Sequence, residues 1–251
     1  MTKRSELQPF PVWVLNLERS TGRRKIMQEQ LDRLGLQHEF IPAVDGRSLS
    51  AEQIGLYSKK SALQNKYREL GRGEIGCALS HTSMWQKLVD IGQEAVLILE
   101  DDILIGEMFP PILFMCNNLP ADWDFINFKT DVVQVPFGEP FYDIYRFCRF
   151  VSPPNRTCAY LLSRSGAQKL LRQVFPIRLP VDDYMGRRCL SGINAYGVDP
   201  QVVALNGEDS DIWIQDDYFT LERSSNARIR NFISSFFQRV KAKLRTCTNG
   251  Q

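Results

Sequence analysis

The segment "EAVLILEDDILI", residues 94–105, limits the possible folds more than any other part of the chain. Five uncharged residues, mostly aliphatic, lead into Glu100, Asp101 and Asp102, and an apolar triplet follows. An aliphatic run without polar alternation is typical of a strand covered on both faces, as in parallel α/β sheets. Three adjacent carboxylates in such a strand are costly unless a positive group lies beside them.

The neighbouring segments agree with an α/β fold. Residues 11–17 predict a strand, residues 23–35 a helix capped by Gly35, and residues 38–46 a second strand. This order favours a mainly parallel central sheet. The later segments predict, in turn, a helix at 73–92, the strand at 94–105, a helix at 106–120, a strand at 123–130, a β-rich insertion at 131–157, a strand at 158–163, a helix at 164–174, and a loop entering a short helix at 178–192.

Composition restricts the class of protein. The chain has 251 residues, of which 43% are hydrophobic, and this is enough for one substantial core. The net charge of +2 gives no reason to expect binding to nucleic acid. The six cysteines form no CxxC pair and there are only two histidines, so we expect no structural zinc site. The N-terminus lacks the apolar region of a signal peptide, and we expect a cytosolic protein with reduced thiols.

The three acids have two interpretations. An open α/β sheet binds ligands at the carboxyl ends of its strands, which is where a strand ending at Glu100 would place them. Oxygen ligands without Cys or His suit Mg²⁺ or Mn²⁺, and such a cation keeps open positions for substrate phosphates. The acids would then hold a metal that bridges protein and diphosphate. The other interpretation is a strand end in solvent, and the residues alone leave both open.

Four blocks of the sequence, taken together, resemble glycosyltransferase family 25. They are "VWVLNLERSTGRRKIMQEQLDRLGLQHEFIPAVDG", "GEIGCALSHTSMWQ", "AVLILEDDILI" and "CAYLLSRSGAQKLL…LPVDDYM", and they span about two thirds of the chain. The family includes bacterial lipopolysaccharide and lipooligosaccharide galactosyl- and glucosyltransferases and animal procollagen galactosyltransferases. The resemblance implies a GT-A-like nucleotide-sugar-binding fold, a divalent metal (Mn²⁺ or Mg²⁺), UDP-galactose or UDP-glucose as donor, and inversion at the anomeric carbon.

The resemblance also assigns roles to the acids. Glu100 to Asp102 are similar to the DxD-like motif of metal-dependent GT-A enzymes, with Glu100 and Asp102 as its outer pair. It implies that Asp102 is the best metal ligand and Glu100 the second. Glu100 or Asp101 would face ribose or sugar hydroxyls of the donor.

The resemblance places the donor-binding residues in three further motifs. Alternatives remain, because Arg23 could decorate a helix surface, Asp45 could serve an Asp-Gly turn, and His81 could be a satisfied structural residue. The motifs are N-L-x-R-x-x-x-R, A-V-D-G and G-E-I-G-C-A-L-S-H, and the implied donor contacts in them are Asn16, Leu17, Arg19, Arg23, Val44, Asp45, Gly46, Glu74, Gly76, Ser80 and His81.

Asp182 and Asp183, in "LPVDDYM", are the favoured catalytic bases. Inversion needs a carboxylate that deprotonates the acceptor hydroxyl, and such help is typically worth about 10²- to 10⁴-fold. The family element reads P-V-D with a variable next residue, so we place Asp182 first. The alternative is that both acids cap the N-terminus of a helix.

A second acidic segment, "NGEDSDI" at 206–212, departs from a common GT-A pattern. Many GT-A enzymes supply a further metal ligand from their C-terminal part, often histidine, and no histidine occurs there in this chain. Asp209 or Asp211 are the substitutes that the segment offers. The third metal ligand therefore stays undetermined by the sequence.

The last segment of the chain differs in character from the rest. Residues 223–251 contain seven basic residues and no acidic one, and their apolar residues form one helical stripe. A basic amphipathic helix suits an anionic membrane surface, whereas the alternative is a helix packed on the domain core. We therefore expect a catalytic domain at 1–222 and a membrane-associating tail at 223–251.

The combined hypothesis is an inverting transferase at the cytoplasmic face of the inner membrane. It would move galactose or glucose from a UDP-sugar to a hydroxyl of a lipid-anchored lipopolysaccharide or lipooligosaccharide core. Two other functions fit the same residues, namely a UDP-sugar hydrolase and a non-catalytic, membrane-associated protein that binds nucleotide sugars. Acceptor-dependent turnover separates the transferase from the hydrolase, and binding of UDP without any turnover would support the non-catalytic protein.

Overall fold

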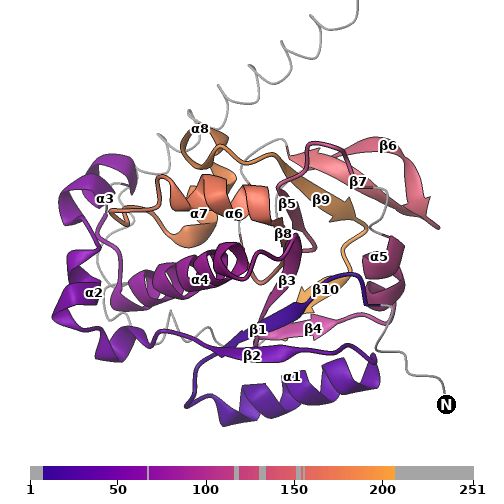
Figure 1. Ribbon diagram of the computed structural model, residues 1–251, viewed down its shortest axis with the longest axis horizontal. Coiled ribbons are helices and arrows are strands. Elements are labelled where there is room, and N and C mark those ends of the chain that lie inside the picture. Colours follow the sequence, from indigo (N-terminus) through magenta and orange to yellow (C-terminus); the bar gives the residue numbers. More distant parts are fainter. Residues whose placement is uncertain are drawn as a thin grey trace, which may run out of the picture.

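The computed structural model describes residues 8–66, 68–115, 119–129, 134–150, 154 and 156–206 (Figure 1). The predicted basic helix at 223–251 and the acids Asp209 and Asp211 lie outside the described residues. No helix within the described part of the chain is both long and apolar enough to cross a lipid bilayer.

The described residues form one large mixed sheet in the order β2-β1-β3-β8-β5-β9-β7-β6. Strands β7 and β8 pair antiparallel with their neighbours, so six of the eight strands run in the same direction. The predicted α/β class with a mainly parallel central sheet is therefore confirmed. The strands are β1 Val12–Asn16, β2 Glu39–Pro42, β3 Ala95–Glu100, β5 Phe125–Asn127, β6 Gln134–Tyr142, β7 Tyr145–Phe150, β8 Ala159–Ser163 and β9 Ala195–Asp199.

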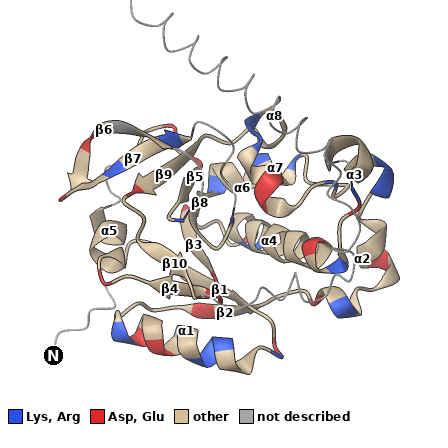
Figure 2. Ribbon diagram, turned by 180° about the vertical axis from the view of Figure 1, so that it is seen from behind, with Lys and Arg blue, Asp and Glu red and all other residues tan. Residues whose placement is uncertain are grey.

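Helices cover both faces of this sheet. Helices α4, α6 and α7 pack on one face, and α1 and α5 pack on the other, with α1 carrying both basic and acidic residues (Figures 1 and 2). The helices are α1 Thr21–Arg33, α2 Ala51–Gly55, α3 Lys59–Lys66, α4 Arg72–Asp90, α5 Phe109–Met115, α6 Arg164–Leu171, α7 Val181–Gly186 and α8 Arg188–Ser191, with a short 3₁₀ helix at Gly46–Ser48.

The two-faced burial explains why the first strands carry continuous apolar runs. Side chains alternate between the faces of a strand. In β3, Val96 and Ile98 enter the core under α4, while Leu97 and Leu99 enter the core under α1. Both faces therefore select for apolar residues, and β3 is fully buried until it reaches Glu100.

The single strand predicted at 94–105 is wrong, because the chain leaves the large sheet at the acids. Strand β3 ends at Glu100, a turn holds Asp101 and Asp102, and β4 (Ile103–Ile105) pairs antiparallel with β10 (Val203–Leu205) in a separate two-stranded sheet. A central position in the large sheet would bury both carboxylates between two apolar layers, at a high desolvation cost. The turn instead places them just beyond the carboxyl end of β3, outside the large sheet.

Candidate functional site

The first part of the site joins the carboxyl ends of two parallel strands. Leu15 of β1 is in register with Glu100 of β3, so the residues that follow them meet. The Asn16 side-chain amide donates a hydrogen bond to Asp101 Oδ2 over 2.5 Å, and Arg23 Nη1 of α1 lies 3.6 Å from Asp101 Oδ1. The Arg23 guanidinium therefore supplies positive charge beside Asp101, the middle of the three acids.

Glu100 is held by two donors at one oxygen. His81 Nε2 lies 3.1 Å and Thr157 Oγ1 2.8 Å from Glu100 Oε1. Burial by itself would raise the pKa of Glu100, but its interactions with His81, Thr157 and Arg156 together outweigh burial and lower that pKa. Glu100 is therefore an ionised, oriented carboxylate whose Oε1 is already satisfied.

A buried row of polar side chains supports His81 from behind. Tyr160 Oη lies 2.8 Å from His81 Nδ1, and Trp85 Nε1 donates to the same Tyr160 oxygen over 3.1 Å. The three side chains come from α4 and β8, and all have 0% exposure. The sequence leaves His81 open between a donor contact and a structural residue, and in the structure its imidazole contacts Glu100 directly.

Asp102 differs from its two neighbours. Its Oδ1 atom is buried and has no hydrogen-bond partner among the described residues. Burial, followed by the charges of Glu100 and Asp101, raises the pKa of Asp102 to about 7, although Arg23 acts in the opposite direction. An orphaned carboxylate oxygen flanked by two further carboxylates fits a hard divalent cation, because such a cation would satisfy that oxygen and offset the like charges.

The loop after β2 contributes a second ion pair. Arg19 Nε lies 3.2 Å from Asp45 Oδ2, and Asp45 Oδ1 accepts a hydrogen bond from the Arg47 backbone to cap the 3₁₀ helix. Asp45 therefore serves its turn and also meets Arg19, which comes from the loop after β1. Leu17 lies in that same loop, where its carbonyl accepts a hydrogen bond from the Ser20 backbone.

Two glycines among the predicted donor contacts allow helix α4 to approach this loop closely. A Cβ atom on Gly76 would lie 2.7 Å from Val44 O, and one on Gly46 would lie 2.5 Å from Arg72 O. Ser80 completes the contact, because its hydroxyl accepts from Val44 N over 2.8 Å and donates to Gly76 O. These predicted donor contacts thus have a visible structural task, which is to fix the loop that carries Asp45.

Glu74 is engaged in a local pair at the start of α4. Arg68 contacts both its carboxylate oxygens at 2.6 Å, and the Gly71 backbone donates to it over 3.0 Å. This arrangement caps α4. The structure therefore shows Glu74 holding the helix start.

Asp182 reaches the same region from the far side. It lies in the first turn of α7, and its Oδ2 accepts a hydrogen bond from the Arg156 backbone over 3.3 Å. The next residue, Thr157, is the one that donates to Glu100. The segment 156–157 therefore connects the predicted base with the first acid of the motif, while Asp183 is placed beside Asp182 through its backbone bond to Asp182 Oδ1.

Cys77 lies among these acids. Burial raises the pKa of the Cys77 thiol well above its usual range, and Glu100, Asp182, Glu74 and Asp102 raise it further, in that order. Three separate chain segments therefore bring carboxylates near one sulfur. Cys77 lies four residues before His81, so both side chains are on one face of α4.

The structure also shows site residues that sequence reasoning missed. Arg156 and Thr157 precede β8, and Tyr160 lies within it, 60 residues after Glu100. Thr157 and Tyr160 read as ordinary residues beside or within a strand, so only the antiparallel pairing of β3 with β8 brings them to the site. Trp85 was likewise hidden in the apolar pattern of α4.

Comparison with known proteins identifies relatives of the chain. A sequence model described as "Glycosyltransferase family 25 (LPS biosynthesis protein)" matches residues 10–185. A "Glycosyltransferase 25 family member" of Anopheles gambiae is 35% identical over 185 residues, covering 69% of this chain and 31% of that protein. "Procollagen galactosyltransferase 1" of Danio rerio is 32% identical over 198 residues, covering 74% of this chain and 32% of that protein. The chain thus spans about a third of the length of the curated relatives it matches.

Among solved structures, a glycosyltransferase involved in glycosylation of the major capsid of PBCV-1 has a TM-score of 0.46 and 10% sequence identity. The likeness covers 84% of this chain and 98% of that one. At this TM-score it assigns neither a fold nor an activity to the chain.

Proposed function

The chain belongs to glycosyltransferase family 25, and on that premise we propose that it transfers galactose or glucose from a UDP-sugar to a hydroxyl of a lipopolysaccharide or lipooligosaccharide core. The observation that carries the proposal is the buried Oδ1 of Asp102, which lies just after the carboxyl end of β3 and has no hydrogen-bond partner among the described residues. Ligands of α/β sheets bind at this edge, and the residues around it are those that the family motifs supply.

Asp102, with Glu100 as second ligand, would hold Mn²⁺ or Mg²⁺ against the donor diphosphate. A bound divalent cation supplies positive charge that offsets the charge of the leaving group. The other residues of the site act on the organic part of the donor. Arg19 and Asp45 are near enough to each other to contact uridine or ribose together, and Asn16 and Arg23 keep Asp101 in place beside the sugar.

Asp182 is the proposed general base. The acceptor oxygen bonds to the anomeric carbon while the bond from that carbon to the β-phosphate oxygen of the donor breaks. The acceptor proton passes to the Asp182 carboxylate, UDP leaves, and the anomeric configuration inverts. The hydrogen bond from the Arg156 backbone orients Asp182 Oδ2, and Asp183 is the second choice of base.

The acceptor and its location follow from the same proposal. A lipid-anchored oligosaccharide requires the enzyme at a membrane, and the basic residues of 223–251 would bind the anionic cytoplasmic face of the inner membrane. Those residues lie outside the described part of the chain. The proposal does not call for nucleic acid as a partner.

The test is UDP release by the purified chain. UDP-galactose, UDP-glucose and UDP-GlcNAc would each be offered with Mn²⁺ or with EDTA. Each reaction would be run without acceptor, with truncated lipooligosaccharide, and with a collagen peptide bearing hydroxylysine, because the matched relatives include a procollagen galactosyltransferase. We expect metal-dependent release with one hexose donor, increased by lipooligosaccharide.

The other outcomes lead elsewhere. Full-rate release without acceptor indicates a UDP-sugar hydrolase. Stimulation by the collagen peptide alone rejects the proposed acceptor and keeps the transferase. UDP binding without turnover in any arm supports a non-catalytic nucleotide-sugar-binding protein.

A further inference from the structure

We propose that Trp85 and Tyr160 hold His81 in the tautomer that carries its proton on Nε2, so that His81 positions Glu100 and is disfavoured as a metal ligand. The inference concerns the site of the proposed function and rests on that function for its purpose. Its physical content, the position of one proton, is independent of whether the chain transfers sugar.

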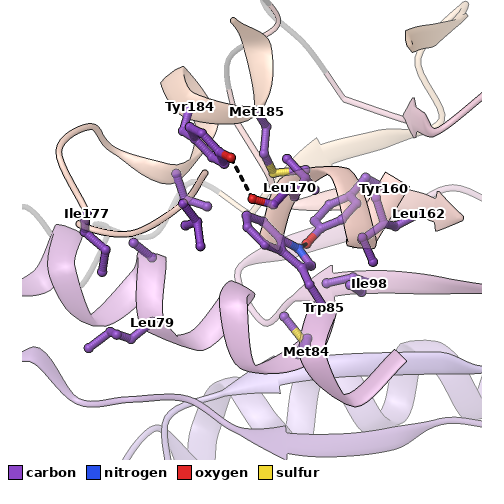
Figure 3. Packing of buried hydrophobic residues seen from close by; sticks show 14 of the residues in the cluster. Leu79, Met84, Trp85, Ile98, Tyr160, Leu162, Leu170, Ile177, Tyr184 and Met185 are labelled. Atoms are coloured by element: carbon purple, nitrogen blue, oxygen red, sulfur yellow. Dashed lines mark hydrogen bonds between the residues drawn. The ribbon is translucent and has the colours of Figure 1, made fainter. Parts of the chain in front are cut away.

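The direction of the hydrogen bonds follows from the chemistry of the donors. An indole N–H can only donate, so the Tyr160 oxygen accepts the bond from Trp85 Nε1. Figure 3 shows the Trp85 nitrogen directed at that oxygen. The Tyr160 hydroxyl proton is then free to point at His81 Nδ1, 2.8 Å away, which must accept it. A neutral imidazole that accepts at Nδ1 carries its hydrogen on Nε2.

The other end of the ring agrees with this assignment. His81 Nε2 lies 3.1 Å from Glu100 Oε1, and an Nε2 hydrogen makes this contact a charge-assisted hydrogen bond. With the hydrogen on Nδ1 instead, the lone pair of Nε2 would face the carboxylate oxygen. The Tyr160 oxygen would accept two bonds, and its own proton would need an acceptor inside a region where His81 and Tyr160 have 0% exposure.

Tyr160 keeps the proton on which this argument depends. Burial raises the pKa of Tyr160 well above its usual range, and the bond from Trp85 only partly counteracts the rise. The hydroxyl is therefore a donor throughout the working pH range. The arrangement is a fixed row of donors that begins at Trp85 and ends on the Glu100 carboxylate.

The Nε2–H tautomer of His81 has a consequence for which metal the site can bind. Ligand atoms of Cys77, His81 and Glu100 lie within 4.8 Å of one another, and these residue types together suit Zn²⁺ and other transition metals. Such a metal needs the Nε2 lone pair, which the tautomer replaces with a hydrogen. The Nε2–H tautomer thus weakens binding of a soft metal beside the oxygen ligands proposed for Mn²⁺ or Mg²⁺.

The test reads the proton directly. The chain has two histidines, so ¹⁵N-histidine labelling gives two ring spin systems, and His38→Gln identifies the one that belongs to His81. Two-bond ¹⁵N–¹H correlation spectra distinguish the Nε2–H form, the Nδ1–H form and the imidazolium. We expect the Nε2–H form in the unaltered chain. Either of the other two forms would overturn the proposal.

Two tyrosine variants test what sets the tautomer. Tyr160→Phe removes the donor to His81 Nδ1 and should lower the ratio of Nε2–H to Nδ1–H forms about fivefold to tenfold. Tyr184→Phe is the matched control, because Tyr184 is also buried in this core but donates to Leu170 O (Figure 3). Its ratio should not change. An unchanged ratio of Nε2–H to Nδ1–H forms in Tyr160→Phe, with a melting temperature showing that the variant is folded, would reject the proposal that Tyr160 sets the tautomer.

Cobalt(II) supplies a second readout that does not depend on activity. Coordination of Co²⁺ by a thiolate gives a sulfur-to-metal charge-transfer band in the near ultraviolet. Titration of this band should show that the unaltered chain and Tyr184→Phe bind Co²⁺ about fivefold to tenfold more weakly than Tyr160→Phe does, and the band of Tyr160→Phe should disappear in the Tyr160→Phe, Cys77→Ser double variant. Equal Co²⁺ affinity of the unaltered chain and Tyr160→Phe, with a thiolate band that is lost in His81→Gln, would mean that the tautomer does not oppose metal binding by His81.

Discussion

Arg23 of α1 lies 3.6 Å from Asp101, the middle of the three acids, and both side chains are mostly buried, at 14% and 11% exposure. Asp101 also receives the Asn16 amide, while neighbouring Asp102 has a buried oxygen without a hydrogen-bond partner among the described residues. Two adjacent residues of the same type therefore differ in what they do for the folded chain. One is compensated by the protein, and the other is the ligand that we propose for a divalent cation.

This difference predicts opposite effects of one substitution. Asp101→Asn should lower the free energy of unfolding by about 1–3 kcal/mol, because Arg23 loses its buried partner. Asp102→Asn should raise the stability of the metal-free protein at pH 8 by roughly 1–3 kcal/mol, because it removes a repelled, buried charge. Chemical denaturation in EDTA measures both. Equal destabilisation by the two variants would contradict the distinction.

The raised pKa of Asp102 predicts a pH dependence. Its folded pKa of about 7 exceeds the ordinary 3.8, so the folded state retains a proton that the unfolded state has lost. The contribution of Asp102 to stability is therefore present at acid pH and is lost as the pH rises toward 7. Mn²⁺ competes with that proton, so the increase in melting temperature caused by Mn²⁺ should be larger at pH 8 than at pH 6. Asp102→Asn is the control, and Mn²⁺ should not raise its melting temperature at either pH.

Asp182→Asn separates chemistry from binding. The substitution removes the proposed base but keeps an oxygen that can accept the Arg156 backbone hydrogen bond. The kcat for transfer should fall about 10²- to 10⁴-fold, with UDP affinity changed less than about threefold. Asp183→Asn should cost less than Asp182→Asn. A full loss with Asp183→Asn and near-normal turnover with Asp182→Asn would reverse the assignment of the base.

Substitution of two glycines by alanine tests how closely α4 must approach the loop after β2. Gly76→Ala would force a Cβ atom to 2.7 Å from Val44 O, so it should lower stability by about 1–3 kcal/mol. Gly22→Ala, in α1, meets nothing within 4 Å and should raise stability by about 0.5–1 kcal/mol. Thermal unfolding of both variants measures the contrast. A neutral effect of Gly76→Ala would show that the loop can move away.

The central part of the fold could be predicted from periodicity. The apolar run of β3 and the helical stripe of α4 gave the right elements, because burial on both faces or on one face leaves a strong pattern. Strand β4 could not be separated from β3, since Ile103 to Ile105 continue the same pattern and only the cost of burying Asp102 divides them. Strands β9 and β10 are short, and no apolar run or alternating pattern in the sequence predicted them. The region 131–157 does contain the β-hairpin of β6 and β7, as its strand-like patches indicated.

The site could be predicted only where a motif names its residues. Asp101 and Arg23 were both proposed from family blocks, and the structure brings them together through the parallel pairing of β1 with β3. Thr157 and Tyr160 could not be found in this way, because their role depends on which strand pairs antiparallel with β3. The task of Gly46 and Gly76 in helix packing is also tertiary, and a sequence shows only that a glycine is present.

The most direct test of the account is calorimetric titration of UDP into the full chain, with Mn²⁺ or with EDTA, for the unaltered protein, Asp102→Asn and Asp90→Asn. Asp90 ends helix α4 on the protein surface, outside the acidic motif, and serves as the matched control. The account predicts metal-dependent UDP binding that Asp102→Asn weakens at least about tenfold and Asp90→Asn preserves. UDP binding of equal strength in Mn²⁺ and EDTA, unaffected by Asp102→Asn, would contradict the claim that these acids form a metal–diphosphate site.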